Sequence, residues 1–463
     1  MLRQPRDIGT IHAMAKELYG ALIEDGASDW QIFQRNATGT GEINLRGRWL
    51  HPEPGHVEVR LVGEATGATV RDWQRAETRP DGTWSVQIVG IPAGGLYRLE
   101  TRYRPQNWLD GEWAPRGDMR HFLGVGDLWV IAGQSNCAGY GRGPYNDPPT
   151  LGVHLFRNSE TWALATHPMN ESTGIRPGRP LEDANPGHSP CLHFGRLLQQ
   201  ALGCPIGLVQ TALGGSPLSR WNPTEPGESD LCEHMLRCVA AVGGKVAGIL
   251  WYQGESETGN LATATTSGDR FIAAVQAWRK QLQAPALPVL TVQLNRLYNA
   301  TDPNADRAWS LVREAQRRVP QRLPGVTVVP SLDLPLCDLV HTSAAGNLLL
   351  GERLARAALG GPSAPDIQSA RRTATGIELR FAPVTSRIDN MDQTAKPFRV
   401  EDAEGEVPIR QVVYPKNDTV QLVLERPLAG NAVVHAGYGA NPPLMPMDME
   451  RQLPVLAFSG LPV

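Results

Sequence analysis

The sequence lacks the features that mark membrane-spanning and nucleic-acid-binding proteins. Its 463 residues contain no uninterrupted apolar run of about eighteen residues, the length that a helix needs to cross a bilayer. The formal net charge is −3, so the excess of basic residues typical of proteins that bind nucleic acid is missing. We therefore expect neither a membrane nor a nucleic acid as a partner.

Cysteine is also scarce, and no two cysteines form a Cys-x-x-Cys pair. The usual zinc-binding patterns are therefore absent, and we predict no metal and no other cofactor. The cysteines are too few to indicate a disulfide-stapled scaffold, so we interpret them as small buried apolar groups. They are Cys137, Cys191, Cys204, Cys232, Cys238 and Cys337.

The beginning of the chain, residues 1–7, has no apolar stretch behind it and does not resemble a signal peptide. We expect a cytoplasmic location, or a periplasmic or secreted one if a leader precedes this sequence. With 41% hydrophobic and 20% charged residues, the composition is that of an ordinary globular protein. The length suits two or three domains, and nothing in the pattern indicates a particular oligomeric state.

The hydrophobic pattern changes three times along the chain. Apolar positions at helical spacing predict an amphipathic helix over residues 8–23, within an N-terminal segment 1–28. Short alternating runs with frequent turns then predict an all-β sandwich, of jelly-roll or immunoglobulin-like type, over 29–108. Alternating strands and helices follow over 109–362, and strand patterns return over 363–463.

The region 109–362 is predicted to be an α/β unit in which a parallel sheet is covered on both faces by helices. Its long irregular segment, 139–189, is rich in Gly, Pro, Asn and Asp, and we expect it to form one wall of a substrate cleft. The expected strands are 127–132, 205–210, 246–252, 288–294 and 325–330, and the expected helices are 190–202, 229–242, 268–283, 305–318 and 344–358.

One stretch of this unit suggests a nucleophile. The apolar run Leu128–Ala132 predicts a central parallel strand, and Gly133 permits a sharp turn that would leave Ser135 exposed beyond the strand end. Reacting groups collect at that end of the strands in open α/β sheets. The alternative is that Ser135 only caps the next helix.

A second stretch supplies the partners that a serine nucleophile needs. Serine reacts at neutral pH only when a base takes its proton, and His341 is the natural base. Asp338, three residues earlier, could orient the imidazole. Glu255 and Asp333 are rival orienters, but Asp338 is preferred to Glu255 because it shares a loop with His341.

Four ordered blocks of the chain resemble the SGNH/GDSL hydrolases, and in particular their sialate O-acetylesterase-like branch of carbohydrate acetylesterases. The resemblance covers roughly residues 120–460 and is specific in the blocks. It implies a three-layer αβα, flavodoxin-like parallel sheet with accessory all-β sandwich domains. The blocks are Gly133-Gln134-Ser135-Asn136, Leu213-Gly214-Gly215-Ser216-Pro217-Leu218-Ser219-Arg220-Trp221, Trp251-Tyr252-Gln253-Gly254-Glu255-Ser256-Glu257 and Asp338-Leu339-Val340-His341.

The resemblance also implies roles for single residues. Ser135, His341 and Asp338 would be catalytic, and an oxyanion hole would be formed by the backbone N–H groups of Ser135 and Gly215 and by the side chain of Gln253. Gly215 is preferred to Gly214 because it directly precedes Ser216. Gly214–Gly215 could instead be a plain turn, and Gln253 could simply satisfy loop backbone groups.

The implied activity is that of a carbohydrate O-acetylesterase, with an acetylated carbohydrate as the partner and plant cell-wall material slightly favoured. A sialate O-acetylesterase, an esterase of longer acyl chains and a catalytically silent carbohydrate-binding protein are the alternatives. Candidate substrate-binding residues are Gly214, Arg220, Trp221 and Glu255, and an indole face could cover a sugar ring.

Overall fold

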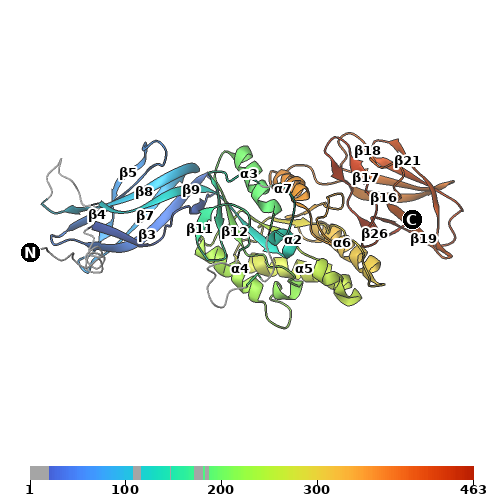
Figure 1. Ribbon diagram of the computed structural model, residues 1–463, viewed down its shortest axis with the longest axis horizontal. Helices are drawn as coiled ribbons and strands as arrows, with labels where there is room; N and C mark the ends of the chain where they lie inside the picture. Colours follow the sequence, from blue (N-terminus) through green and yellow to red (C-terminus); the bar gives the residue numbers. More distant parts are fainter. Residues whose placement is uncertain (1–19, 108–115, 146, 172–180, 183–186) are drawn as a thin grey trace, which may run out of the picture.

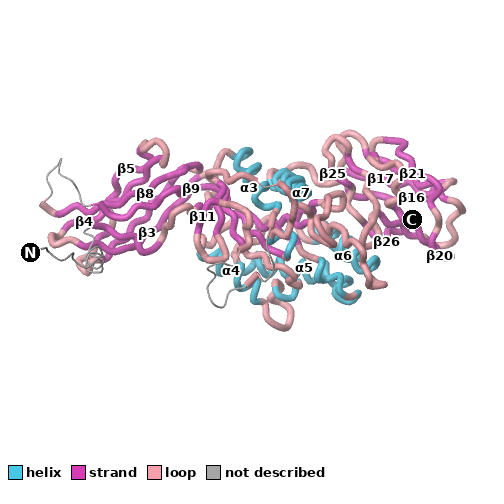
Figure 2. Tube along the Cα trace, in the orientation of Figure 1, coloured by secondary structure: helices cyan, strands magenta, loops and turns pink. Residues whose placement is uncertain are grey.

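The computed structural model describes residues 20–107, 116–145, 147–171, 181–182 and 187–463. Three parts follow one another along the long axis of an elongated molecule (Figure 1). Strands dominate both ends, and the helices gather in the middle part (Figure 2). Among the described helices, none is both long and apolar enough to span a bilayer.

The N-terminal part is a sandwich of two sheets. One has the strand order β1-β3-β7-β6, and the other is built from β5, β4, β8, β2 and the beginning of β9. Alternate residues of both sheets, such as Leu45, Leu61 and Leu99, form a common core, as their alternating pattern predicts. The strands are β1 (Gly20–Asp25), β2 (Ile32–Gln34), β3 (Thr40–Leu50), β4 (Gly55–Gly63), β5 (Thr69–Arg75), β6 (Glu77–Thr78), β7 (Thr83–Pro92), β8 (Gly94–Pro105) and β9 (Arg116–Gly133).

The helix predicted over 8–23 is wrong at its end, and residues 8–19 lie outside the described part of the chain. Residues 20–23 belong to β1, which pairs antiparallel with β3. Ala21 and Ile23 are buried in the sandwich core. The same apolar residues suit a strand, and the hydrogen bonds offered by β3 decide between the two structures. The sandwich therefore begins before residue 29.

Strand β9 joins the first two parts of the molecule. Near its start it pairs with β8 and, in parallel, with β2 (Ile32 opposite Gly124). Its last residues lie between the parallel strands β12 and β13, with Trp129 opposite Gly248. The predicted strand 127–132 is thus the end of an 18-residue strand. The predicted domain boundary between residues 108 and 109 would place all of β9 in the central part. The first half of the strand nevertheless pairs with strands of the N-terminal part, so β9 belongs to both parts.

The central sheet has the order β11-β10-β12-β9-β13-β14-β15 and is parallel except for β11. The five predicted strands and five predicted helices are confirmed, although α5 begins seven residues earlier than the predicted 268. The elements are α2 (Ser135–Ala138), β10 (Val153–Phe156), β11 (Trp162–Leu164), α3 (Pro190–Leu202), β12 (Ile206–Gln210), η1 (Leu218–Arg220), α4 (Asp230–Ala241), β13 (Gly248–Tyr252), η2 (Glu255–Gly259), α5 (Leu261–Gln281), β14 (Val289–Val292), α6 (Ala305–Arg322), β15 (Val326–Val329) and α7 (Ala344–Ala358).

Successive residues of β9 pack into different cores. Trp129 and Ile131 lie in a cluster with residues of α3 and α7, whereas Val130 and Ala132 lie in another with residues of α4 and α5. The segment 139–189 was expected to be irregular, yet it contributes β10 and β11 to the sheet. These strands are too short to produce a clear alternation in the sequence.

The C-terminal part is all-β, as predicted, and has its own core. Two four-stranded sheets have the orders β16-β17-β22-β21 and β20-β19-β23-β26, and a small third sheet is β18-β24-β25. The strands are β16 (Asp366–Thr373), β17 (Gly376–Ala382), β18 (Ile388–Asp389), β19 (Phe398–Asp402), β20 (Gly405–Glu406), β21 (Ile409–Lys416), β22 (Thr419–Leu424), β23 (Val433–Ala436), β24 (Met447–Asp448), β25 (Leu453–Pro454) and β26 (Phe458–Pro462).

A buried arginine of α6 fastens the C-terminal part to the central sheet. The Arg313 guanidinium donates to the carbonyl oxygens of Leu294 and Asn295 beyond β14, and to those of Gly439 and Ala440 in the C-terminal part. Burial lowers its pKa to about 9. Because the guanidinium satisfies several backbone carbonyls at once, the two parts are held in one fixed arrangement.

Candidate active site

A sharp turn after β9 presents Ser135. Gly133 has φ +117°, and a Cβ there would lie 2.3 Å from the Tyr252 carbonyl oxygen on the neighbouring strand β13. Only glycine fits a turn that is both left-handed and this close to another backbone. Ser135 then begins the short helix α2. It was expected to be exposed, but it is only 7% exposed, because the loops that carry its partners cover it.

Ser135, His341 and Asp338 lie in hydrogen-bond contact. The Ser135 Oγ is 2.8 Å from His341 Nε2, and His341 Nδ1 is 2.7 Å from Asp338 Oδ2. A serine hydroxyl donating to Nε2 and an Nδ1–H donating to the carboxylate form the chain that a serine nucleophile needs. The three residues predicted from two distant stretches therefore meet in one place.

Local hydrogen bonds hold the Asp338 carboxylate beside the imidazole. Its Oδ1 accepts the backbone N–H groups of Val340 (2.9 Å) and His341 (2.7 Å). Burial raises the pKa of Asp338, but these N–H groups and the imidazole outweigh it and leave the pKa below its ordinary value. Asp338 is therefore ionised at neutral pH.

The two rival carboxylates are engaged elsewhere. Glu255 Oε1 accepts the side-chain amide of Asn136 at 2.6 Å, and burial raises the pKa of Glu255. Asp333 forms a two-pronged ion pair with Arg353, at 2.7 and 2.6 Å. Among the hydrogen bonds of the described residues, neither carboxylate contacts His341.

Sequence reasoning missed the role of Asn136, which links the serine to the histidine loop. Its Oδ1 accepts the N–H of Thr342 at 2.9 Å, and its Nδ2 donates to the carbonyl of Val340 at 3.3 Å as well as to Glu255. Both contacts flank His341. The signal was present, because Asn136 directly follows the serine in the first block.

Gln134, on the other side of Ser135, was also overlooked. Its Oε1 accepts the N–H of Ser256 at 3.2 Å, and its own N–H donates to the Tyr252 carbonyl at 2.9 Å. The two amide residues around the serine thus tie α2 to the loops that follow β13 and β15.

Two backbone N–H groups near the serine are free. Within the described part of the chain, the N–H groups of Ser135 and Gly215 have no hydrogen-bond partner, whereas the N–H of Gly214 donates to Glu182 at 2.9 Å. Gly215 has φ +65° and space around the position of a Cβ. Of the two glycines, Gly215 is the one whose donor remains available.

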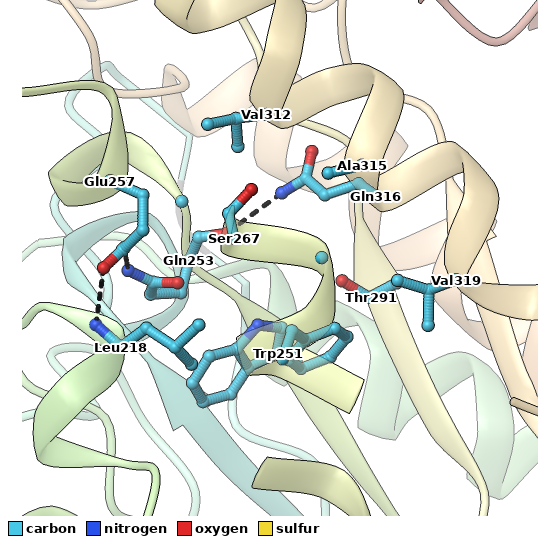
Figure 3. A pocket seen from close by; sticks show the side chains of 13 residues that line it. Leu218, Trp251, Gln253, Glu257, Ser267, Thr291, Val312, Ala315, Gln316 and Val319 are labelled. Carbon is cyan, nitrogen blue, oxygen red and sulfur yellow. Dashed lines mark hydrogen bonds between the residues drawn. The ribbon is translucent and has the colours of Figure 1, made fainter. Parts of the chain in front are cut away.

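The side-chain amide of Gln253 points toward Glu257 (Figure 3). Glu257 also accepts the N–H of Leu218 at 2.9 Å, and the carbonyl of Gln253 accepts from Gln316 at 3.0 Å. A carboxylate can only accept hydrogen bonds, so it sets the NH₂ side of the amide toward itself. Gln253 and Glu257 line a small cavity of about 20 Å³ with Trp251.

The structure contradicts a substrate-binding role for one candidate, Trp221, and shows a second, Arg220, in an ion pair. Trp221 is fully buried, its Nε1 donates to Ser216 Oγ at 3.1 Å, and its ring packs edge-on against Trp251. It belongs to the core beneath the sheet and cannot stack on a sugar. The Arg220 guanidinium is held by both oxygens of Asp230, at 2.9 and 2.6 Å.

An aromatic residue that the sequence did not single out lies beside the histidine. The Tyr140 ring is 5.0 Å from the His341 ring, centroid to centroid. Its hydroxyl contacts Glu182, which also accepts from Asn170 (2.6 Å) and from Gly214. Tyr140, Asn170 and Glu182 belong to the segment 139–189, so part of that segment reaches the site.

The cysteines are free thiols, and five of the six are buried, as their interpretation as apolar groups predicts. Burial raises the pKa of Cys137, which lies behind the serine in α2. Cys337, partly exposed, accepts the N–H of Arg142 at 3.2 Å.

An α/β sheet with a serine, a histidine and an aspartate in contact at the carboxyl end of a central strand is the arrangement found in serine hydrolases. The family described as carbohydrate esterase, sialic acid-specific acetylesterase, matches residues 125–360, and the chain belongs to this family. It is a carbohydrate esterase that removes acetyl groups, and the resemblance of the four sequence blocks is confirmed.

Two known proteins are similar to this chain. A probable carbohydrate esterase of Arabidopsis thaliana is 29% identical over 255 residues, which cover 50% of this chain and 90% of the relative. The crystal structure of a carbohydrate acetylesterase from Xanthomonas citri superposes with a TM-score of 0.67 at 22% identity, covering 93% of this chain and 97% of that one. This second similarity extends over all three parts of the molecule and shows that the two proteins share a fold.

Proposed function

We propose that this enzyme removes acetyl groups from acetylated poly- or oligosaccharides of plant cell-wall type, through an acyl-enzyme formed on Ser135. The hydrogen-bonded chain from Ser135 through His341 to Asp338 is the observation that carries the mechanism. The two β-rich parts beside the catalytic unit favour a large carbohydrate substrate. Sialic acid bearing O-acetyl groups, the substrate in the family's description, is the second candidate.

In the first half of the reaction, Ser135 Oγ attacks the acetyl carbonyl while His341 Nε2 takes its proton. The tetrahedral intermediate collapses, and His341 returns the proton to the departing sugar hydroxyl. A water molecule then attacks the acetyl-serine with His341 again as base, which releases acetate and restores the serine. Asp338 keeps the imidazole in the required tautomer throughout.

Negative charge on the carbonyl oxygen is stabilised by three donors in this proposal: the N–H groups of Ser135 and Gly215 and the amide of Gln253. The free N–H groups of the first two support their part. For Gln253, the contact with Glu257 fixes the orientation of the NH₂ group, and its nitrogen also lies 3.5 Å from the Ser216 carbonyl, so the oxyanion would replace that carbonyl as the acceptor of the second hydrogen. Each such donor contributes about 2.7–4 kcal/mol in comparable enzymes.

The wall of the acetyl and sugar pocket is assigned to Tyr140 and Glu182 rather than to Trp221. Tyr140 lies next to the histidine and Glu182 next to the glycine block, and the Tyr140 ring offers an apolar face. Gly214 supports the wall through its hydrogen bond to Glu182. Glu255 acts behind the site, on Asn136.

We also infer that the central part has the three-layer αβα, flavodoxin-like arrangement. The support is that alternate residues of β9 pack with α3 and α7 in one cluster, and with α4 and α5 in the other. The proposed division is an N-terminal sandwich, a catalytic unit ending near residue 362 and a C-terminal β-rich domain over 363–463, with β9 common to the first two.

The substrate is tested by measuring acetate release from acetyl-xylan, acetylated xyloglucan oligosaccharides and O-acetyl sialic acid, beside a chromogenic ester series of rising acyl length. We expect acetylated plant glycans to react fastest and acetyl to be the best acyl group, because each methylene that does not fit costs about 1–3 kcal/mol in selectivity. Ser135→Ala is the control and should release almost no acetate.

Each other outcome removes one part of the proposal. Faster release from sialic acid would assign that substrate instead, and equal turnover of long acyl chains would point to a general esterase. Binding of the glycans without hydrolysis would leave a carbohydrate-binding protein. A Ser135→Ala variant that keeps most of its activity would contradict the mechanism.

A further inference from the structure

Three titratable side chains outside the catalytic site converge inside the segment 139–189. The side chains of Asp147, His167 and His188 are 2%, 7% and 5% exposed, and one ligand atom from each lies within 4.8 Å of the other two. Their positions in the sequence, about twenty residues apart, form no familiar motif. Among the contacts of the described residues, none of them touches Ser135 or His341.

The polar atoms that face one another in this cluster are not satisfied. Asp147 Oδ2, His167 Nε2 and both ring nitrogens of His188 are buried without a hydrogen-bond partner in the part of the chain that the structure describes. Buried polar atoms are almost always paired, since leaving one unpaired costs about 1–3 kcal/mol. Three of these atoms, Asp147 Oδ2, His167 Nε2 and His188 Nε2, lie close enough together to share one ligand, which would leave only His188 Nδ1 without a partner.

The two distances from the Asp147 carboxylate to the histidines match those between ligands of a tetrahedral ion. Asp147 Oδ2 is 3.3 Å from His188 Nε2 and 3.5 Å from His167 Nε2. Two ligands bound to zinc at roughly 2.0 Å and a tetrahedral angle lie about 3.3 Å apart. Two imidazoles and one carboxylate are also an ordinary set of zinc ligands.

Neighbouring side chains orient the Asp147 carboxylate for metal binding. Its second oxygen, Oδ1, accepts from His193 Nδ1 at 2.9 Å and from Arg196 Nη1 at 2.6 Å, which leaves Oδ2 directed at the two histidines. Outer partners of this kind orient metal-binding carboxylates.

We propose that Asp147, His167 and His188 bind one Zn²⁺ ion, with water as the fourth ligand, and that the ion ties the described chain around these three residues to the catalytic helix α2. His188 supports this role, because its backbone pairs with Gly141, and the adjacent Gly187 N–H donates to the carbonyl of Gly139 at 2.5 Å. Gly139 in turn caps α2 through the carbonyl of Ser135. The ion takes no part in ester hydrolysis.

The alternative is a cluster without metal, in which the two Nε2–H groups donate to the carboxylate. The N–H of Ser189, 3.4 Å from His167 Nδ1, favours this arrangement, because an acceptor at Nδ1 places the ring proton on Nε2. The contact is at the long limit for a hydrogen bond. Metal analysis distinguishes the two arrangements directly.

The test measures zinc in the purified 463-residue protein by mass spectrometry, and then titrates chelator-treated protein with Zn²⁺ and with Co²⁺. We expect about one zinc per chain and, with Co²⁺, the intense visible absorption of a tetrahedral site. His167→Gln and His188→Gln should each weaken zinc binding by about 100-fold or more, since even outer partners cost 10–100-fold.

His193→Gln is the matched control, because His193 contacts only the outer oxygen of Asp147; it should retain one zinc with a smaller loss of affinity. A wild-type protein that holds no zinc and shows no tetrahedral Co²⁺ spectrum would overturn the proposal, whatever the folding of the variants. Equal zinc binding by wild type and by the His167→Gln/His188→Gln double variant would overturn it as well.

Discussion

At the scale of single residues, the candidate site assigns different tasks to carboxylates of the same chemistry. Asp338 lies against the imidazole and keeps a low pKa, whereas Glu255 is buried beside Asn136 and its pKa is raised by burial. Glu257 is buried as well, and it orients the amide of Gln253. The environment of each carboxylate, rather than its type, decides which proton or donor it controls.

Because the carboxylates have different partners, we expect different effects when each one is replaced by its amide. Asp338→Asn should lower kcat by roughly 10⁴-fold, because an amide no longer holds the reactive tautomer of His341. Asp333→Asn, whose carboxylate only pairs with Arg353, should leave kcat within about tenfold. The measurement is acetate release under saturating substrate, with circular dichroism as the check on folding.

If Glu255→Gln proves the more damaging change and Asp338→Asn is mild, the orienter of His341 has been misassigned.

The stability contributed by Asp338 is present above its unfolded pKa and is lost as the pH falls through its lower folded pKa. Because the pKa of Asp338 in the folded protein is below its ordinary value, its carboxylate stays ionised at pH 5. We therefore expect that a loss of activity near pH 5 does not come from protonation of Asp338.

At the scale of elements, the turn between β9 and α2 positions the nucleophile. The hydrophobic pattern predicted the strand and the glycine marked the turn, so this element was readable from the sequence. The pattern could not show why the turn is so restricted. The backbone of β13 passes directly over Gly133, and this contact exists only after the sheet has formed.

We predict that Gly133→Ala destabilises the protein strongly, since a Cβ would collide with the Tyr252 carbonyl in addition to the strain of a positive φ. Gly203→Ala is the matched control, because Gly203 has φ +65° but no atom within 4 Å of a Cβ. The control should lose only about 1–2 kcal/mol, the cost of the left-handed conformation.

Urea unfolding compares the two variants, and kcat shows whether Ser135 is displaced. Gly133→Ala should lose at least twice the unfolding free energy of the control, together with most of its activity. Equal losses in the two variants would mean that the contact with Tyr252 does not restrict the turn.

At the scale of the whole molecule, contacts far apart in the sequence join the three parts. Strand β9 continues from the sandwich into the central sheet, and Arg35 pairs with Asp127 through both carboxylate oxygens across this junction. His154 of β10 makes a second connection, because its Nδ1–H donates to the Trp30 carbonyl at 2.6 Å, while its Nε2 accepts the N–H of Gly152. Burial lowers the pKa of His154 to about 4.

Because burial lowers the pKa of His154, we predict that the stability of the protein depends on pH through this junction. Between about pH 6.5 and 4 the unfolded chain binds a proton at His154 while the folded one does not, so stability falls as the pH falls through that window. The full shift corresponds to roughly 3 kcal/mol. His154→Gln keeps a donor for Trp30 without titrating, and should therefore lose less stability between pH 7 and pH 5 than the wild type.

Thermal unfolding at both pH values measures the difference, with the comparison at pH 7 correcting for any loss of packing in the variant. Parallel slopes for the two proteins would show that His154 does not control the junction.

The order and type of the main elements, and the blocks around Ser135 and His341, could be predicted from the amino-acid sequence. Such features depend on local periodicity, on turn residues and on short motifs, all of which are properties of neighbouring residues. The folded structure was needed to show that residues 20–25 form a strand, that Trp221 is buried, that Asn136 contacts Thr342, and that Asp147 lies beside His167 and His188. In each of these cases a distant segment supplies the hydrogen bonds or the packing, and no local pattern records which segment that will be.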